Sequence, residues 1–298
     1  LKSPLFRFLL WKHGLSPDKP REANRKYLAD LLTELKASRY VQKAVLLGMD
    51  GVYDHNGRLN RAHTDFLIGN DYVLKTAQAH PGELLAGVSI NPQRRDAIDE
   101  VHRCADAGAV LVKVLPNAKQ FDPANSKYKP FYRALSERQL PFLSHVGYEF
   151  SLIGKDQSVG EPDRLRLALD EGATVIAAHA CSYGLMLYEK FLPTLRDLVT
   201  RYPHFYADIS ALTLPNRMRM LLHLRQYPEL HERLLFGTDY PLSVFHMAAW
   251  GRVALGTLRK MIGTKNRFDR QVEVCNGLQL GFRSLGDLLP HSAGMAGR

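Results

Sequence analysis

Seven short apolar runs, each rich in β-forming residues, recur along this chain of 298 residues. They are continuously apolar rather than strictly alternating, which is typical of parallel strands covered on both faces. A parallel sheet is therefore predicted, with strands in KAVLLGM (43–49), ELLAGVSINP (83–92), GAVLVKVLP (108–116), LPFLSHVG (140–147), ATVIAAHA (173–180), HFYADISA (204–211) and LLFGTDYP (234–241).

Amphipathic stretches of helical length separate these runs, for example 95–108, 128–139 and 163–172. The alternation indicates βαβ units, and seven units approach the (β/α)8 TIM barrel, which spans about 250 residues. A doubly wound open sheet is the alternative, but no GxGxxG or GxxxxGK[ST] motif follows any run to supply its usual nucleotide site. The sequence therefore predicts an α/β fold, a TIM barrel, as one domain over residues 1–298.

Composition limits the partners of the chain. The net charge is +10, but lysines and arginines are scattered, so nucleic acid is not expected and small anionic substrates are favoured. The three cysteines are far apart, which offers no disulfide framework and favours a cytoplasmic location. The stretch SPLFRFLLWKHGL (3–15) is expected to be an amphipathic helix, no segment is expected to span a membrane, and a homodimer is the default assembly.

Polar residues stand at the C-terminal ends of most runs, and these ends converge on the active site of a barrel. Among them, His145, His179 and Asp239 suit Zn²⁺ or a similar divalent ion, because a catalytic ion needs about three protein ligands plus water. A lone histidine at a strand end is more often structural, so the expectation depends on the joint placement. The whole set is Asp50, Asn91, Lys113, His145, His179, Asp208, Ser210 and Asp239.

The motifs SHVG, AAHA and FGTDYP, in this order, resemble strand ends of the amidohydrolase superfamily. The GTDYP ending and the KVLP run are similar to its amidohydrolase-related family, which holds metal-dependent hydrolases and nonoxidative decarboxylases. This resemblance covers most of the chain. It implies that His145 is a metal ligand, that His179 is a ligand or an acid/base group, and that Asp239 binds the ion and handles the proton of its water.

The chain departs from the family pattern at its start. The family's first strand ends in an HxH pair that supplies two ligands, and no HxH occurs in this sequence. We expect the first strand to be missing or to lie upstream of residue 1, because a closed barrel needs it to pair all backbone groups. A derivative barrel without a full metal site is the alternative.

Lys113 lies inside the apolar run VLVKVLP, where an unpaired cation is costly, so it is expected to face an acidic or anionic group. A mononuclear site with Lys113 as its polar partner is preferred over a binuclear site bridged by a carboxylated lysine. Lys113, Tyr148, Tyr183 and Arg217 are expected to bind the substrate, with arginine suited to a carboxylate.

The expected reaction is hydrolysis of an ester, lactone or amide of a small carboxylated substrate. A divalent ion, Zn²⁺ or Mn²⁺, would lower the pKa of its water to about 7. Asp239 would accept the proton, and His179 would stabilise or protonate the oxyanion or leaving group. The alternatives are a nonoxidative decarboxylase on the same site, a metal-independent lactonase, and a noncatalytic barrel.

Overall fold

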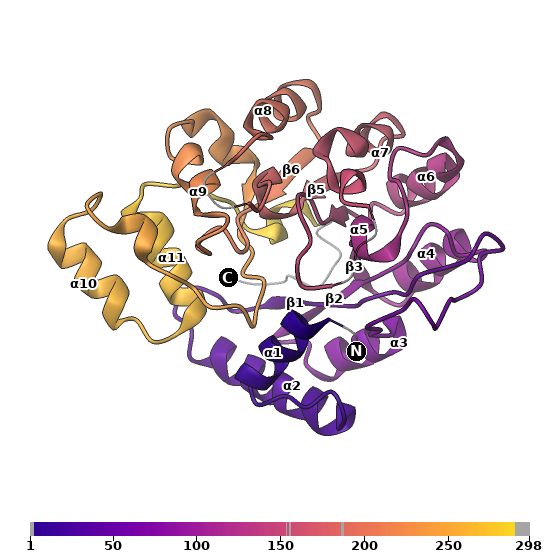
Figure 1. Cartoon of the computed structure of the whole chain (residues 1–298), viewed down its shortest axis with the longest axis horizontal. Coiled ribbons are helices and arrows are strands. Elements are labelled where there is room, and N and C mark those ends of the chain that lie inside the picture. The colour runs from indigo at the N-terminus through magenta and orange to yellow at the C-terminus, as the bar shows by residue number, and fades with distance from the viewer. Residues whose placement is uncertain (1–2, 153, 155, 186–187, 290–298) are drawn as a thin grey trace.

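The computed structural model describes residues 3–152, 154, 156–185 and 188–289. Seven parallel strands form one sheet in which each strand pairs with the next one along the chain (Figure 1). Every predicted run contains a strand, so the predicted parallel α/β architecture is confirmed. The strands are β1 (Ala44–Leu47), β2 (Leu84–Val88), β3 (Ala109–Val114), β4 (Phe142–Ser144), β5 (Val175–Ala177), β6 (Phe205–Asp208) and β7 (Leu234–Leu235).

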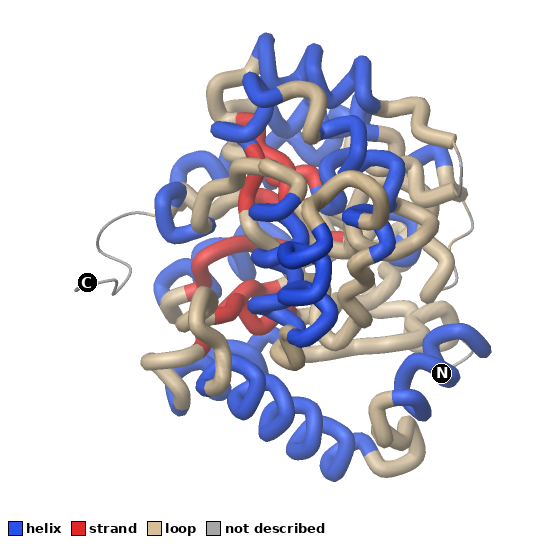
Figure 2. Tube along the Cα trace, turned by 90° about the vertical axis from the view of Figure 1, so that its left-hand side faces the viewer, coloured by secondary structure: helices blue, strands red, loops and turns tan. Residues whose placement is uncertain are grey.

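Helices surround the curled sheet and connect its strands (Figures 1 and 2). The α-helices are α1 (Pro4–Lys12), α2 (Pro20–Lys36), α3 (Asn70–Ala79), α4 (Ala97–Asp106), α5 (Pro116–Lys119), α6 (Lys129–Glu137), α7 (Arg166–Asp170), α8 (Leu192–Arg201), α9 (Met218–Leu224), α10 (Leu255–Gly263) and α11 (Arg267–Gly277). Short 3₁₀ helices are η1 (Ser126–Tyr128), η2 (Ser158–Gly160), η3 (Pro162–Leu165), η4 (Ala178–Cys181), η5 (Pro228–Arg233), η6 (Met247–Ala249) and η7 (Leu285–Leu288).

The main core lies between the sheet and its helices. Helix α6 shows why the sequence folds this way, because its buried residues Phe131, Tyr132 and Leu135 fall on one helical face. The rings of Phe131 and Tyr132 pack edge-on against Phe142 of β4. Burying one such side chain stabilises the fold by about 2–3 kcal/mol.

Three expectations from composition can be compared with the structure. Cys104, Cys181 and Cys275 are buried and unpaired, as expected for a chain without a disulfide framework. Within the described part of the chain, every helix is too short or too polar to cross a bilayer. The expected N-terminal helix is α1, whose Lys12 Nζ donates to Ser243 Oγ at 3.2 Å.

Among the described residues the sheet does not close, and β1 and β7 are its two edges. Beside β7, the Arg283 N–H donates to the Leu234 carbonyl and the Phe236 N–H donates to the Arg283 carbonyl. No strand among the described residues pairs with the outer edge of β1. A cavity of about 740 Å³ lies between these edges and inside the curl of the sheet. The seven strands thus agree with the expectation of a barrel that lacks one strand.

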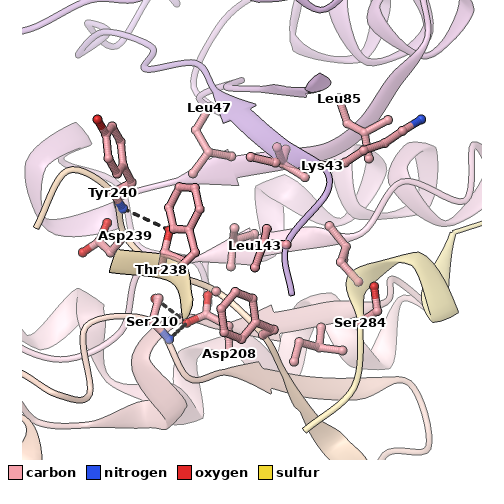
Figure 3. Close-up of a pocket in the computed structure, with 18 of the residues that line it drawn as sticks. Lys43, Leu47, Leu85, Leu143, Asp208, Ser210, Thr238, Asp239, Tyr240 and Ser284 are labelled. Atoms are coloured by element: carbon pink, nitrogen blue, oxygen red, sulfur yellow. Dashed lines mark hydrogen bonds between the residues drawn. The ribbon is translucent and has the colours of Figure 1, made fainter. Parts of the chain in front are cut away.

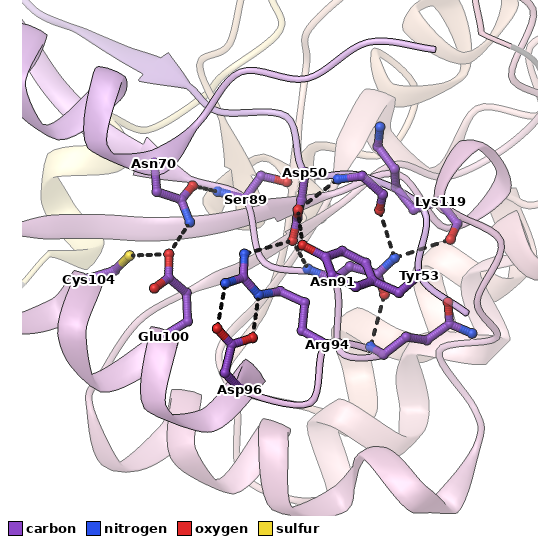
Figure 4. Close-up of polar contacts among 12 residues, drawn as sticks. Asp50, Tyr53, Asn70, Ser89, Asn91, Arg94, Asp96, Glu100, Cys104 and Lys119 are labelled. Carbon is purple, nitrogen blue, oxygen red and sulfur yellow. Dashed lines mark hydrogen bonds and ion pairs between the residues drawn. The ribbon is translucent and has the colours of Figure 1, made fainter. Parts of the chain in front are cut away.

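A polar network joins the C-terminal ends of β1, β2 and β3 (Figure 4). The Asp50 carboxylate accepts hydrogen bonds from the Tyr53 hydroxyl at 2.9 Å and from the Asn91 N–H at 2.8 Å. Its Oδ2 atom lies 3.6 Å from Nη1 of Arg94. The Asn91 side chain donates to the Lys119 carbonyl at 3.2 Å. These contacts fix the loops beside the strand ends, where a site can be built.

Lys119 is a buried cation of this network, with 3% of its surface exposed. Its ammonium group donates to the Phe66 carbonyl at 3.4 Å. Burial lowers the pKa of Lys119 to about 8, although the charges of Asp50 and Asp65 oppose the shift. An unfolded lysine has a pKa of about 10.4, so between these two values the unfolded chain binds more protons and stability rises with pH.

Replacing this lysine should abolish the rise. We expect the free energy of unfolding to increase by up to about 3 kcal/mol through Lys119 between about pH 8 and 10.5, and Lys119→Met to lack this increase. Urea unfolding at a series of pH values measures it. The matched control is Lys75→Met at an exposed helical position, which should keep the wild-type slope. Identical slopes in Lys119→Met and wild type would contradict the prediction.

Candidate active site

Five of the polar residues at strand ends lie together at the C-terminal edge of the sheet. Lys113 is in β3, His145 follows β4, His179 lies in η4 after β5, and Asp208 ends β6. Asp239 lies in the loop beyond β7 and lines the cavity, to which its side chain is exposed. The other four are buried. Their convergence follows from parallel pairing, which brings the carboxyl ends of all strands to one side.

The two predicted histidine ligands are neighbours. The ring centroids of His145 and His179 are 5.1 Å apart with an interplanar angle of 72°. The Nε2 atom of His145 is buried without a hydrogen-bond partner and lies 3.6 Å from Glu149 Oε2. Burial, and next the charge of Arg217, lowers the pKa of both imidazoles well below the usual value. Both rings are therefore neutral at pH 7 and can offer lone pairs.

Backbone strain is concentrated at these positions. The φ angles are +58° at His179, +47° at Ala180, +59° at Cys181 and +56° at Asp239. A residue other than glycine in this left-handed region costs about 1–3 kcal/mol and persists only where the surrounding structure enforces it. Such residues cluster at functional sites. The strain therefore supports a functional role for the turn after β5 and the loop after β7.

Two cations accompany the histidines. Burial lowers the pKa of Lys113, and the charges of Asp208 and Asp239 oppose this shift, so the expectation that Lys113 faces acidic groups is confirmed. Arg217 is 5% exposed, and its guanidinium donates to the carbonyls of Ser182 at 3.0 Å and Tyr148 at 3.3 Å. A guanidinium has five donors, so Arg217 keeps capacity for an anionic ligand.

The predicted tyrosines lie beside the cavity rather than in its wall. The Tyr148 ring stacks on Phe150 at 4.6 Å, and the Tyr183 ring packs edge-on against Phe191 at 5.4 Å. The Tyr148 N–H donates to the Tyr183 carbonyl at 2.9 Å, which joins the two loops. Tyr148 reaches the site through its carbonyl, which accepts the hydrogen bond from Arg217.

The cavity has an apolar wall along the inner face of the sheet and polar residues in two places, since Lys43 and Ser284 line it away from the strand-end residues. Asp208, Ser210 and Asp239 lie together on one side of it (Figure 3). The inner face of the sheet supplies the apolar wall, made of Val45, Leu47, Leu85, Leu111, Leu143, Ile176 and Leu235. The arrangement fits a ligand with an apolar body and a charged or carbonyl-bearing end.

Glu149 is a site residue that the sequence analysis missed. It is buried, and its Oε1 atom accepts hydrogen bonds from the N–H groups of Ser151 and Leu152. Burial raises the pKa of its carboxyl group. Its only sequence signal is its position four residues after His145, because it lies in a loop and not at the end of an apolar run.

Donors of the kind that bind a divalent ion are present, although the set is incomplete. Within the described ranges, no three or more His, Cys, Asp or Glu side chains are grouped closely enough to hold a metal ion. The unpartnered Nε2 of His145, the adjacent His179 and the carboxylate of Asp239 are nevertheless suitable donors. These three residues are the predicted ligands, but the described residues do not bring all three within reach of one ion.

Comparison with solved structures places this site on a known fold. A TIM-barrel protein from Bordetella bronchiseptica is similar with a TM-score of 0.59 and 17% identity, over 87% of this chain and 83% of that one. The 5-carboxyvanillate decarboxylase of Sphingomonas paucimobilis is similar with a TM-score of 0.53 and 15% identity, over 94% and 90%. At these identities the likeness establishes the fold, so the predicted barrel class is confirmed.

A third structure contains a metal. It is a mutant 5-carboxyvanillate decarboxylase of Novosphingobium aromaticivorans with bound manganese and 3-methoxy-4-hydroxy-5-nitrobenzoic acid. Its TM-score is 0.50 at 15% identity, over 93% of this chain and 89% of that one.

Sequence comparison gives the family. No curated protein matches the chain. The amidohydrolase family model matches residues 26–255. Because the match extends over more than half of the 298 residues, the chain belongs to the amidohydrolase family.

Proposed function

We propose that the protein is a metal-dependent hydrolase that cleaves an ester, lactone or amide of a small carboxylated substrate. The observation that carries this proposal is the pair of neutral imidazoles at the barrel mouth, one with an unpartnered Nε2 atom. The pair lies close enough to Lys113 and Arg217 for their charges to lower the pKa of both rings. Ligand nitrogens and substrate-binding cations thus occupy one site.

His145, His179 and Asp239 would hold the ion, Zn²⁺ or Mn²⁺. When bound, such an ion lowers the pKa of water to about 7 and polarises a carbonyl group. Asp239 is suited to accept a proton, because its carboxylate lines the cavity and its desolvation by the surrounding protein raises its pKa. The manganese in one similar structure supports a divalent ion here.

Lys113 and Arg217 would bind the carboxylate of the substrate. Arginine binds a carboxylate through two parallel hydrogen bonds, which fixes its orientation as well as its position. The apolar wall formed by Leu47, Leu143 and Ile176 would contact the body of the substrate. Together these contacts would place the scissile carbonyl between the histidine pair and Asp239.

A nonoxidative decarboxylase is the second candidate. The likeness to the 5-carboxyvanillate decarboxylase of Sphingomonas paucimobilis favours it, as does an apolar wall that suits an aromatic ring. In that reaction a substrate carbon would take up a proton, and the bond to the departing carbon dioxide would break. The same cations would bind the substrate.

Metal content tests the proposal directly. We expect the purified protein to retain about one equivalent of zinc or manganese, and His145→Ala and Asp239→Ala to lose it, because each removes a ligand. Elemental analysis before and after dialysis against a chelator measures this. The control is His63→Ala, at an exposed position in a loop, which should retain the metal. A wild-type protein that holds no metal and cannot be loaded would favour the metal-independent lactonase.

Arg217 should determine the preference for a carboxylated substrate. Arg217→Gln should raise KM for a carboxylated aryl ester by about 10- to 100-fold, since a charge-assisted bond contributes about 1.5–3 kcal/mol. Hydrolysis of the matching uncharged ester should change little. Steady-state kinetics on the two esters measures the difference.

Two further variants define this effect. Arg217→Lys keeps the positive charge but cannot form the two parallel hydrogen bonds of a guanidinium, so it should give an intermediate KM. Arg219→Gln, at an exposed position in helix α9, which begins directly after Arg217, should behave as wild type. Equal losses on the charged and uncharged esters in Arg217→Gln would argue against carboxylate binding.

A further inference from the structure

One carboxylate oxygen ties the tips of β5 and β6 together. Asp208 Oδ1 accepts hydrogen bonds from the main-chain N–H of His179 at 3.0 Å, from the main-chain N–H of Ser210 at 2.9 Å, and from the Ser210 hydroxyl. Asp208 is 8% exposed. Because three donors converge on this oxygen, Oδ1 is committed to holding the two strand tips together.

The same contacts determine which ring nitrogen of His179 carries hydrogen. The Nδ1 atom lies 3.0 Å from the Ser210 carbonyl oxygen, which can only accept. It also lies 2.9 Å from Ser210 Oγ, whose own hydrogen is donated to Asp208. Both partners require the hydrogen on Nδ1, so Nε2 of this cavity-lining ring carries a lone pair.

The contact between Asp208 and the His179 N–H also holds a strained turn. His179 begins three consecutive left-handed residues, with φ of +58°, +47° and +59°. Hydrogen bonds to a charged acceptor contribute about 1.5–3 kcal/mol each, which is enough to offset strain of about 1–3 kcal/mol per residue. Without an acceptor at this point, the buried N–H of His179 would have no partner and the turn would relax.

We propose that Asp208 is a positioning residue for His179. Its Oδ1 atom holds the left-handed turn and, through Ser210, keeps the hydrogen of His179 on Nδ1, so that Nε2 presents its lone pair to the cavity. What matters at Asp208 is an oxygen acceptor, not a negative charge. The use of Nε2 in catalysis rests on the proposed function, but the orientation of the ring does not.

Two variants separate these roles. Asp208→Asn keeps an oxygen acceptor of the same shape, and the three donors select oxygen over nitrogen at this position. Asp208→Ala removes the acceptor. Protein labelled with ¹⁵N-histidine, free of metal and substrate, shows by long-range ¹H–¹⁵N correlation which nitrogen of each ring carries hydrogen. The signals of His179 are those that disappear in His179→Gln.

We expect hydrogen on Nδ1 of His179 in the wild type and in Asp208→Asn, and a mixture of the two tautomers in Asp208→Ala. Hydrogen on Nε2 in the wild type would overturn the proposal without any Asp208 variant, even if Asp208→Ala fails to fold. Wild-type signals in Asp208→Ala would overturn it as well. Loss of the wild-type pattern in Asp208→Asn would overturn it in favour of a role for the negative charge.

Zinc affinity, measured by competition with a chelator, gives a second readout. Misplacing a ligand by removing its supporting group typically weakens metal binding by about 10- to 100-fold, which is the loss expected in Asp208→Ala. Asp208→Asn should bind zinc nearly as the wild type does, and an equal loss in both variants would overturn the proposal. A wild-type protein that binds neither zinc nor manganese would refute the proposed function, while the tautomer of His179 would still decide this inference.

Discussion

Parallel hydrogen bonding between neighbouring strands is the constraint on which the rest of the structure depends. Because the seven strands run in one direction, their carboxyl ends meet, and residues as distant as Lys113 and Asp239 share one site. Ladder bonding stops at the strand ends, so the backbone there can take conformations that a strand forbids. There the carboxylate of Asp208 accepts a hydrogen bond from the main-chain N–H of His179, just beyond the end of the neighbouring strand β5.

The strand order and the convergence of the polar strand-end residues could be predicted, because both follow from the pattern of apolar runs. Continuous apolar runs mark doubly covered strands, and a lysine inside such a run implies acidic neighbours, as found for Lys113. Other features could not be predicted from the sequence, again for physical reasons. The run 234–241 begins with three apolar residues, yet only Leu234–Leu235 is strand, because apolar character indicates burial and not strand pairing. The role of Glu149 depends on how its loop folds back on its carboxylate, and the left-handed turn at His179 depends on a contact with Asp208 of β6, 29 residues away, so no strand or helix pattern reveals them.

Because the sheet stays open on one side, its interior contains a cavity. In a closed barrel, side chains from alternate strands fill the interior as packed layers. Here Leu47, Leu111 and Leu143 face a cavity that continues up to Asp208 and Asp239. The apolar interior and the polar site thus form one continuous space. What fills this interior therefore also determines the polarity and water content around the charged groups.

The left-handed turn after β5 constrains which substitutions the protein can accept at the residues of the turn. Ala180 has a φ of +47°, where glycine would avoid a steric penalty that alanine bears. A glycine here would remove that penalty, but it would also give more backbone freedom to the segment that orients His179. Selection for thermal stability and selection for turnover therefore act in opposite directions on Ala180 and Cys181. In laboratory evolution, substitutions at these two positions are where gains in melting temperature should be accompanied by losses in rate.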